Sequence, residues 1–587
     1  MRLEEYWGVG PKTRELLVEE LGTERAVRAI ESGDVRTLSQ AGLPRGRATR
    51  ILRRATGGAG MDTLATRDAR AAYKEVLEIV AAHAVTDRAA DRIRVLTPLS
   101  TREEIETRLE DVLTARDAWT ALEAGERESV LDAYDSYDAR GGNDLASVET
   151  ALAVLETGVE GGPFEALADL EADRLETAAN ALSALEGGRV RSDVDEELDR
   201  LRRALGAVED LDANTHTVLE ELQEEGVGDA DRFREAFEDR LLSSVDVTID
   251  QVRDAMPADA ADATDFVGGT VRALRGDLRE AVDERERTVR ADLEDTLEET
   301  EAEVRRAVEA VEEIALSLSL ARFSLAYDCT RPTLLEGESA ALSVLEARNL
   351  ALAAHGEDVQ PVTYALGEHS ISVPEDLEDG PGSERVAVLT GANSGGKTTL
   401  LETLCQVVVL ASMGLPVPAE HAEVTPVDAL VFHRRHASFN AGVLEATLRS
   451  IVPPLSDSGR TLMLVDEFEA ITEPGSAADL LHGLVRLTVD REALGVFVTH
   501  LAEDLEPLPP EARGDGIFAE GLGPDLELLV DYQPRFGTVG RSTPEFIVSR
   551  LLANANDRTE RAGFETLAQA VGREAVQRTL VDARWNE

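Results

Sequence analysis

The sequence predicts a multidomain chain: a small all-α domain, a longer all-α region and an α/β domain built around a phosphate-binding loop. Three observations support this division. Two short glycine turns each open a helical pattern within residues 1–58. Residues 66–345 are rich in Ala, Leu, Glu and Arg and poor in aromatics, which is typical of helices. From 346 to 550, apolar strand-like runs alternate with helical patterns, as in α/β domains, and a helical tail is expected at 551–587.

The N-terminal region contains two similar units, and in each a glycine turn precedes a short apolar helix pattern. The first turn lies at 8–13 and the second at 41–46. Together they resemble a tandem helix-hairpin-helix domain, in which backbone N–H groups of the turn contact DNA phosphates independently of sequence. The second turn departs from the usual Gly-x-Gly, and docking to another protein is the alternative. The resemblance implies these DNA-binding candidates: Gly8, Gly10, Lys12, Gly42, Arg45 and Arg47.

Two apolar stripes with coiled-coil-like spacing run through the long helical region. They cover 198–211 and 274–311, and they predict a protruding antiparallel arm. Ordinary helix packing is the alternative explanation for most of these positions. Between the stripes, the alternation Val245–Ile249 predicts a short strand.

The segment 389–400 has the spacing of a phosphate-binding P-loop, after an apolar run at 386–389 and before a helical pattern. Its glycines let backbone N–H groups turn toward phosphates at a helix N-terminus. Lys397 is one of only three lysines in the chain, which suggests that a compact ammonium is required here. A chance glycine-rich turn is the alternative. The nucleotide-binding candidates are Gly391, Asn393, Gly395, Gly396, Lys397, Thr398 and Thr399.

A second strand, 460–465, ends in the carboxylates Asp466 and Glu467, which after a P-loop is the Walker B pattern. Thr398 and Asp466 are therefore the expected Mg²⁺ ligands, and Glu467 is expected to polarise the attacking water. A third apolar strand, 494–498, leads to His500, which at such a strand end can contact the terminal phosphate. The catalytic candidates are Lys397, Glu467 and His500.

Between the P-loop and the Walker B strand lies the segment 436–442, followed by an amphipathic helix pattern. Its small hydroxyl residue, Ser438, is first of all a helix N-cap candidate. In ABC-type ATPases the equivalent element closes on the nucleotide of the partner subunit. Ser438 is therefore the candidate for a nucleotide contact across a dimer.

In this order, the motifs resemble those of the MutS family of DNA-binding ATPases over roughly 70–550. The P-loop segment 390–399, the segment 414–420, the Walker B segment 466–475 and Thr499–His500 carry the resemblance. Within the P-loop, Ala392 and Ser394 depart from the family pattern. The resemblance implies ATP hydrolysis with Mg²⁺, a lever-and-clamp core with the clamp at about 196–312, and composite ATP sites in a homodimer.

Several features favour the branch of the family that lacks mismatch-reading domains. Only about 65 residues precede the helical core, and Phe233–Glu235, which matches the mismatch wedge tripeptide, lies within the clamp and is interpreted as coincidence. The segment 537–542 resembles the post-ATPase segment of that branch, whereas the tail is too short for its nuclease domain. The signature segment also departs from the family, because Glu445 follows two residues later than usual.

The composition indicates the salt conditions to which the protein is adapted, and says less about its fold. The formal net charge is −55 and the hydrophobic content 43%, which together suggest a folded protein adapted to concentrated salt, where charges are screened over about 3 Å. The two cysteines have no disulfide or zinc spacing, and no apolar run approaches the roughly 20 residues of a membrane span. A cytoplasmic, halophilic protein without membrane contact is expected.

The leading hypothesis is a homodimeric Mg-ATP-driven clamp that binds branched recombination or repair DNA by structure and not by sequence. The alternative is a ribosome-associated ATPase, because relatives without mismatch domains act on stalled ribosomes. A chromosome-organising ATPase fits less well, since the arm is short and no Leu-Ser-Gly-Gly occurs. An ABC transporter subunit does not explain the helical core.

Overall fold

The computed structural model describes the whole chain except residues 1–2, 4–5, 58–59, 225–229, 338, 372–379, 392–395, 436–440, 457–458, 472–473, 523–527, 541–543, 556 and 586–587. The chain divides into two compact units. The first comprises Met1–Asp135, Val159–Glu165 and Glu312–Glu587, and the second comprises Ser136–Gly158 and Ala166–Val311.

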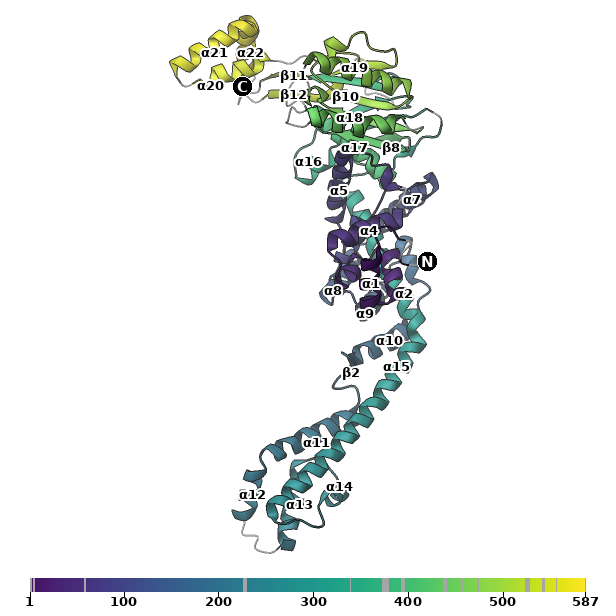
Figure 1. Ribbon diagram of the computed structural model, residues 1–587, viewed down its shortest axis with the longest axis vertical. Helices are drawn as coiled ribbons and strands as arrows, with labels where there is room; N and C mark the ends of the chain where they lie inside the picture. The colour runs from purple at the N-terminus through teal and green to yellow at the C-terminus, as the bar shows by residue number, and fades with distance from the viewer. Residues whose placement is uncertain are drawn as a thin grey trace. The chain divides into compact units, whose positions relative to one another are not determined.

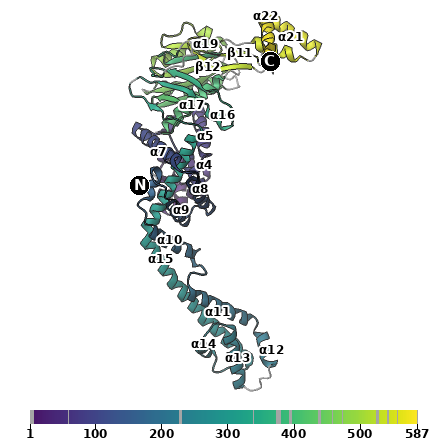
Figure 2. The same ribbon diagram turned by 180° about the vertical axis from the view of Figure 1, so that it is seen from behind.

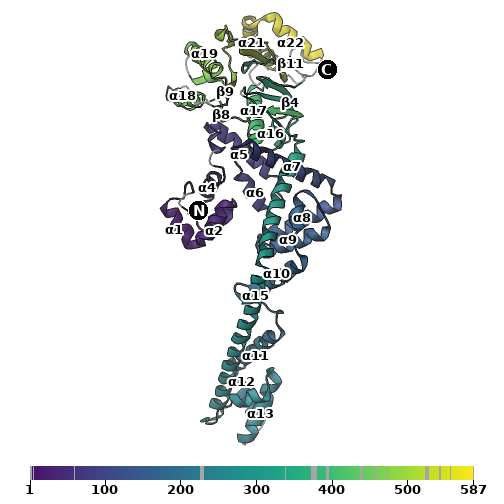
Figure 3. The same ribbon diagram turned by 90° about the vertical axis from the view of Figure 1, so that its right-hand side faces the viewer.

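Four short helices form the N-terminal part of the first unit, and each of the two predicted glycine turns opens one of them (Figure 3). Gly10 precedes α1 and Pro11 starts it, because proline is tolerated at a first helical position. Gly8 has a φ of 81°, a conformation that side chains disfavour. The helices pack on a common apolar core that includes Leu17, Ile30 and Leu52. They are α1 (Pro11–Leu21), α2 (Thr23–Glu31), α3 (Val35–Gln40) and α4 (Arg45–Gly57).

The next helices connect this small domain to the sheet-containing part of the first unit. Arg36 forms an ion pair of 2.8 Å with Asp87 on α6, and Arg53 donates to the carbonyl of Arg94. A capping box fixes the start of α7, where Thr101 and Glu104 satisfy each other's backbone N–H groups. These elements are η2 (Gly60–Asp62), α5 (Arg67–Ala81), α6 (Asp87–Arg94), α7 (Arg102–Ala121) and α8 (Ala124–Ala139).

The α/β part of the first unit contains a six-stranded sheet in the order β12-β11-β6-β10-β9-β8. All neighbouring strands are parallel except β12, which runs antiparallel to β11. The strands are β6 (Val386–Gly391), β8 (Ala429–His433), β9 (Thr461–Asp466), β10 (Leu494–Val498), β11 (Ala512–Leu522) and β12 (Leu528–Arg535).

Helices cover both faces of this sheet, which explains why its central strands are continuously apolar. Alternate residues point to opposite faces: Leu389 joins a core with α17 and α5, whereas Val388 joins a core with α18 and α19. Figure 1 shows α17 and α19 on either side of the strands. The helices are α17 (Lys397–Ser412), α18 (Ala441–Ser456) and α19 (Pro474–Asp490), with the short turns η4 (Phe468–Ile471) and η5 (Ala502–Leu505).

A smaller four-stranded sheet, in the order β3-β7-β4-β5, lies in the same unit. The predicted domain boundary at 345–346 falls inside β4, which spans Leu342–Ala347. This strand cannot be divided between two domains, since it pairs with both β5 and β7. The strand-bearing region therefore begins at β3, about a dozen residues earlier than the alternation of patterns indicated. The elements are β3 (Thr333–Leu334), β4 (Leu342–Ala347), α16 (Leu350–Ala354), β5 (Val362–Leu366) and β7 (His421–Val424).

The second unit is almost wholly helical, and both apolar stripes contribute to its core. The N-cap Asp195 of α11 accepts two hydrogen bonds from Arg285 of α15, at 2.8 and 2.6 Å. Phe233 packs edge-on against Phe266, which gives the wedge-like tripeptide a structural role. The elements are α9 (Asp144–Thr157), α10 (Ala172–Ala184), β1 (Leu185–Glu186), β2 (Arg189–Val190), α11 (Glu196–Ala213), α12 (Thr215–Glu224), α13 (Ala230–Ser244), α14 (Ile249–Ala255) and α15 (Ala263–Ala326), whose last part belongs to the first unit. The short turn η3 (Gly162–Leu167) begins in the first unit and ends in the second.

Two details of this unit differ from the sequence prediction. The segment Val245–Ile249 is not a strand: Thr248 caps α14 in a capping box with Gln251, so its side chain starts a helix. Beyond Leu293, the buried face of α15 passes through Glu303 and Ala307, whereas Val304 and Val308 are only half-buried. Burial of Glu303 is possible because Arg306 forms an ion pair with it at 2.5 Å.

The C-terminal tail is helical, as predicted, and α22 packs against β11 (Figure 2). Its helices are α20 (Pro544–Asn554), α21 (Arg558–Val571) and α22 (Arg573–Trp585). In the described part of the chain, no helix combines the length and apolarity needed to cross a bilayer.

Candidate nucleotide-binding site

The three sequence motifs of the α/β domain meet at one edge of the six-stranded sheet. Strands β6, β10 and β9 are adjacent and parallel, so their carboxyl ends lie side by side. Gly391 ends β6, Asp466 ends β9, and His500 follows β10. The carboxyl edge of a parallel sheet is the usual place for a ligand in α/β domains. The topology therefore places Gly391, the paired carboxylates and the histidine at the same edge of the sheet.

The start of α17 has the geometry of an anion-binding helix N-terminus. Gly396, with a φ of 76°, precedes the helix, and Lys397 is its first residue. The Nζ atom of Lys397 donates to the carbonyl of Gly391 at 2.9 Å, across the mouth of the loop. Burial lowers the pKa of Lys397, an effect opposed by the nearby carboxylates of Glu467 and Asp466. The candidates Asn393 and Gly395 lie outside the described residues.

Three backbone segments cross closely at the end of β6, before the predicted P-loop. A Cβ atom on Gly540 would lie 2.9 Å from the Cα of Gly391 and 3.1 Å from the Cα of Gly516. The N–H of Gly540 also donates to Oγ1 of Thr390 at 2.6 Å. The segment 537–540 thus holds the end of β6 in place, and glycine is required there by the lack of space.

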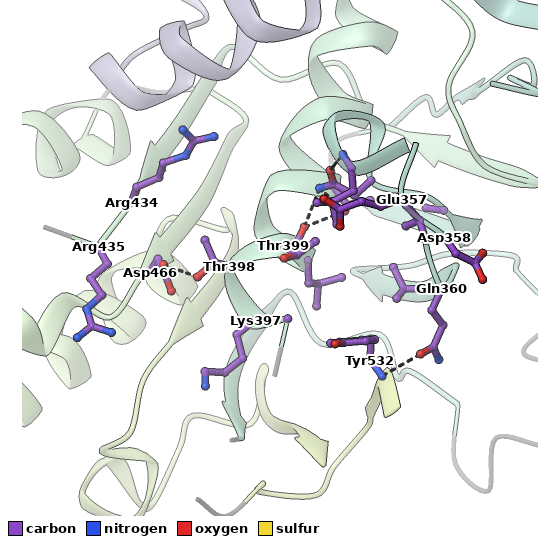
Figure 4. Close-up of a pocket in the computed structure, with 18 of the residues that line it drawn as sticks. Glu357, Asp358, Gln360, Lys397, Thr398, Thr399, Arg434, Arg435, Asp466 and Tyr532 are labelled. Carbon is purple, nitrogen blue, oxygen red and sulfur yellow. Dashed lines mark hydrogen bonds between the residues drawn. The ribbon is translucent and has the colours of Figure 1, made fainter. Parts of the chain in front are cut away.

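Thr398 and Asp466 form the contact expected of a Mg²⁺-binding pair. The hydroxyl of Thr398 donates to Oδ2 of Asp466 at 2.8 Å (Figure 4). Burial raises the pKa of Asp466, and the hydrogen bond from Thr398 opposes that shift. Among the described residues, the buried Oδ1 atom of Asp466 has no hydrogen-bond partner. A hard cation held by these oxygens would satisfy that atom, so the residues fit Mg²⁺.

Glu467 has a strained backbone conformation, and its carboxylate lies between the side chains of Arg435 and His500. Its φ of 41° is unusual for a residue other than glycine, and its N–H donates to the carbonyl of Val498 at 3.0 Å. Its Oε1 atom lies 3.3 Å from Nε2 of His500, and its Oε2 atom lies 2.8 Å from the guanidinium of Arg435. The backbone N–H of His500 donates to Glu469 at 2.6 Å, which fixes the turn after β10.

A cavity of about 700 Å³ opens beside these groups. Its wall includes Thr398 and Thr399, and the carbonyl of Thr399 accepts from Asn349 at 3.3 Å. Figure 4 shows Tyr532 beside the start of α17, with its backbone N–H bonded to Gln360. The sequence analysis did not single out the following lining residues: Asn349, Glu357, Asp358, Gln360, Arg434, Arg435 and Tyr532.

Ser438, the candidate for a contact across a dimer, lies outside the described residues. Arg434 and Arg435 come shortly before Ser438, directly after the apolar strand β8. That position was the only signal in the sequence that could have found them. Arg434 is engaged within the unit, since it lies 2.9 Å from Glu402 and its backbone N–H donates to Asp68 at 2.9 Å.

The DNA-binding candidates of the small N-terminal domain form an exposed group around the two turns. Gly8, Gly10, Lys12 and Gly42 are all exposed. Two of the candidate arginines have partners inside the unit: Arg45 forms an ion pair with Asp91, and Arg47 donates to the Thr13 hydroxyl at 2.7 Å. Their guanidinium groups therefore also hold the domain together.

Comparison with known proteins agrees with this geometry. A family model described as MutS domain V matches residues 387–503, from the P-loop strand to just beyond His500. A DNA-binding protein MutS2 of Pyrococcus furiosus is 46% identical over 211 residues, which cover 36% of this chain and 36% of the relative. Residues 387–503 thus carry a MutS domain V, and the relatives that match this part of the chain are MutS proteins.

Other MutS-family relatives are more distant. An endonuclease MutS2 of Thermus thermophilus is 32% identical over 173 residues, 28% of this chain and 23% of the relative. The DNA mismatch repair protein MSH6 of Saccharomyces cerevisiae is 30% identical over 142 residues, 22% of this chain and 11% of the relative. The matched stretches span little more than a third of the relatives' length at most.

Proposed function

We propose that this MutS-family chain is a DNA-binding ATPase that uses Mg-ATP to close a homodimeric clamp on branched DNA. The observation that carries the proposal is the contact between Thr398 and Asp466 beside Lys397, at the mouth of a cavity large enough for a nucleotide. The names of the relatives, DNA-binding protein and endonuclease MutS2, support DNA as the partner.

Each residue has a defined task in the proposed hydrolysis. The N-terminus of α17 and Lys397 would bind the phosphates, since backbone N–H groups and an ammonium both favour anions. Thr398 and Asp466 would hold Mg²⁺, which supplies neutralisation of charge on the phosphate oxygens. Glu467 would accept a proton from the attacking water, and His500 would contact the terminal phosphate. Ser438 would complete the site of the partner subunit.

The distribution of charge supports the N-terminal domain as the main DNA contact. Residues 1–58 contain 11 basic and 8 acidic side chains, whereas the arm at 196–312 contains 15 basic and 35 acidic side chains. Phosphate contacts depend on basic groups, and an acidic surface repels the DNA backbone. The arm would therefore surround DNA without neutralising it.

The first test is the ATPase rate in concentrated potassium salt, with linear duplex, single strand, four-way junction DNA or ribosomes added separately. Selective stimulation by the junction is the expected result. Stimulation by ribosomes alone would overturn the DNA assignment and leave the ATPase assignment standing. The ribosome alternative gains no support from the names of the relatives.

A matched pair of lysines tests the DNA contact. Lys12 and Lys74 are both exposed, but only Lys12 lies beside a glycine turn. Lys12→Gln should weaken junction binding and lower the slope of log affinity against log salt by about 1, as expected for one lost phosphate contact. Lys74→Gln should change neither quantity. Equal effects of the two substitutions would remove the turn from the DNA interface.

A further inference from the structure

Arg435 lies next to the proposed general base although no motif of the sequence includes it. It is the second residue after β8, whose partner strand β9 ends at Asp466. Its guanidinium lies 2.8 Å from Oε2 of Glu467, and the other carboxylate oxygen lies 3.3 Å from His500. Both oxygens of Glu467 are thus engaged, so the carboxylate is not free to accept a proton from water.

The two partners of this ion pair differ in their freedom to move. The side chain of Glu467 is 13% exposed, whereas that of Arg435 is 59% exposed. Water can solvate the exposed guanidinium when it leaves the pair, so Arg435 is the partner that can move. Arg435 also lines the cavity that Lys397 and Thr398 line, where the phosphates of a nucleotide would enter.

We propose, on the basis of the proposed ATPase function, that Arg435 senses the terminal phosphate of ATP. Without nucleotide it holds Glu467, and when ATP binds it moves to the terminal phosphate and releases the carboxylate. A guanidinium fits phosphate oxygens as well as carboxylate oxygens, which makes the exchange chemically matched. ADP lacks the third phosphate and leaves the pair of Arg435 and Glu467 intact.

The exchange changes the chemistry of Glu467. Departure of Arg435 leaves the Oε2 atom of Glu467 open to a hydrogen bond from water. In the hydrolysis step, the water oxygen forms a bond to the terminal phosphorus and the bond from phosphorus to the ADP oxygen breaks. The proton of the water passes to Glu467 and later to phosphate or solvent. Arg435 is therefore a positioning residue that makes the base available only when ATP is present.

The neighbouring arginines differ from Arg435 and provide a control. Arg434 is fixed by Glu402 and belongs to the wall of the cavity. Arg449 on α18 is 79% exposed and, within the described part of the chain, forms an ion pair with Glu445 of the same helix at 2.6 Å. Arg449→Gln thus removes an arginine ion pair, more exposed than that of Arg435, at a position outside the cavity wall.

The test compares the affinities of fluorescent ATP and ADP analogues, with Mg²⁺, for six proteins. They are the wild type, Arg435→Gln, Arg435→Lys, Glu467→Gln, the double variant of Arg435→Gln with Glu467→Gln, and Arg449→Gln. Arg435→Gln should weaken ATP binding about tenfold, as expected for a lost charge-assisted hydrogen bond, and change ADP binding less than about twofold. Glu467→Gln should tighten ATP binding roughly two- to fivefold, because Arg435 no longer has a competing partner.

The double variant decides the question. Tightening by Glu467→Gln should be absent when Arg435 is replaced, and Arg435→Lys should partly restore the preference for ATP over ADP. Equal weakening of ATP and ADP by Arg435→Gln, or persistence of the tightening in the double variant, would overturn the proposal. The wild type's own ATP hydrolysis tests the proposed function separately, since a wild type that hydrolyses ATP leaves that function standing under either result.

Discussion

A methyl group on Gly540 should damage the nucleotide site from outside it. In Gly540→Ala, the new Cβ atom would lie 2.9 Å from the Cα and 3.1 Å from the N of Gly391, and 3.1 Å from the Cα of Gly516. Contacts between carbon atoms are normally 3.5–4.0 Å, and all three atoms are backbone atoms that cannot rotate away. Overpacking costs about 1–3 kcal/mol, and we expect the upper end of this range because two strands must shift.

The shift of β6 should also weaken ATP binding, since the carbonyl of Gly391 holds Lys397 at 2.9 Å. Urea denaturation measures the free energy of unfolding, and a fluorescent ATP analogue measures affinity. Gly563→Ala is the matched control: Gly563 lies within α21 and has no heavy atom within 4 Å of its would-be Cβ, so the variant should be about 0.5–1 kcal/mol more stable. If Gly540→Ala unfolds at the wild-type urea concentration and binds ATP normally, the argument from close packing is wrong.

Two further predictions concern buried groups of the same unit. Arg513 and Asp515 form a buried ion pair at 3.0 Å, with side chains 7% and 0% exposed, so Asp515→Asn should destabilise the protein by about 3–5 kcal/mol in urea denaturation. The apolar pair Arg513→Met with Asp515→Leu should cost less than Asp515→Asn, and a loss below about 1 kcal/mol in Asp515→Asn would contradict the assignment. Burial raises the pKa of Cys329 and Cys405 to about 12, so a disulfide reagent at pH 8 should label both thiols only on unfolding. Because both pKa values are raised on folding, this contribution to stability is complete below the unfolded pKa of about 8.5 and is lost as pH rises toward 12. Labelling of either thiol in the folded protein at the rate of a free cysteine would show that the site is open.

The elements of the proposed nucleotide site stand out in the sequence because each is a short local motif. A glycine-rich loop, a strand ending in two carboxylates and a strand leading to histidine each carry their own signal. The contact between Thr398 and Asp466 joins two of them across 68 residues of sequence, and it was expected because both motifs supply ligands to the same Mg²⁺. The ion pair of Arg435 and Glu467 was not predictable, because it depends on which strand lies next to β9.

The structure differs from the sequence prediction at two places, and each difference has a local physical cause. Alternating apolar residues at 245–249 indicated a strand, but five residues carry little periodic signal and the capping role of Thr248 prevailed. The stripe on α15 continued through Val304 in the sequence pattern. In the structure, the polar Glu303 takes the buried position because Arg174 and Arg306 lie near its carboxylate. Ion pairs of this kind are invisible to a hydrophobic pattern.

The most direct test of the account is the ATP hydrolysis rate of Glu467→Gln against the wild type, at saturating Mg-ATP in concentrated potassium salt. The account predicts that wild type hydrolyses ATP and that Glu467→Gln binds ATP at least as tightly but hydrolyses it at least about a hundredfold more slowly, as expected for loss of a general base. Hydrolysis by Glu467→Gln at the wild-type rate would contradict the assignment of Glu467 and, with it, the proposed role of the site.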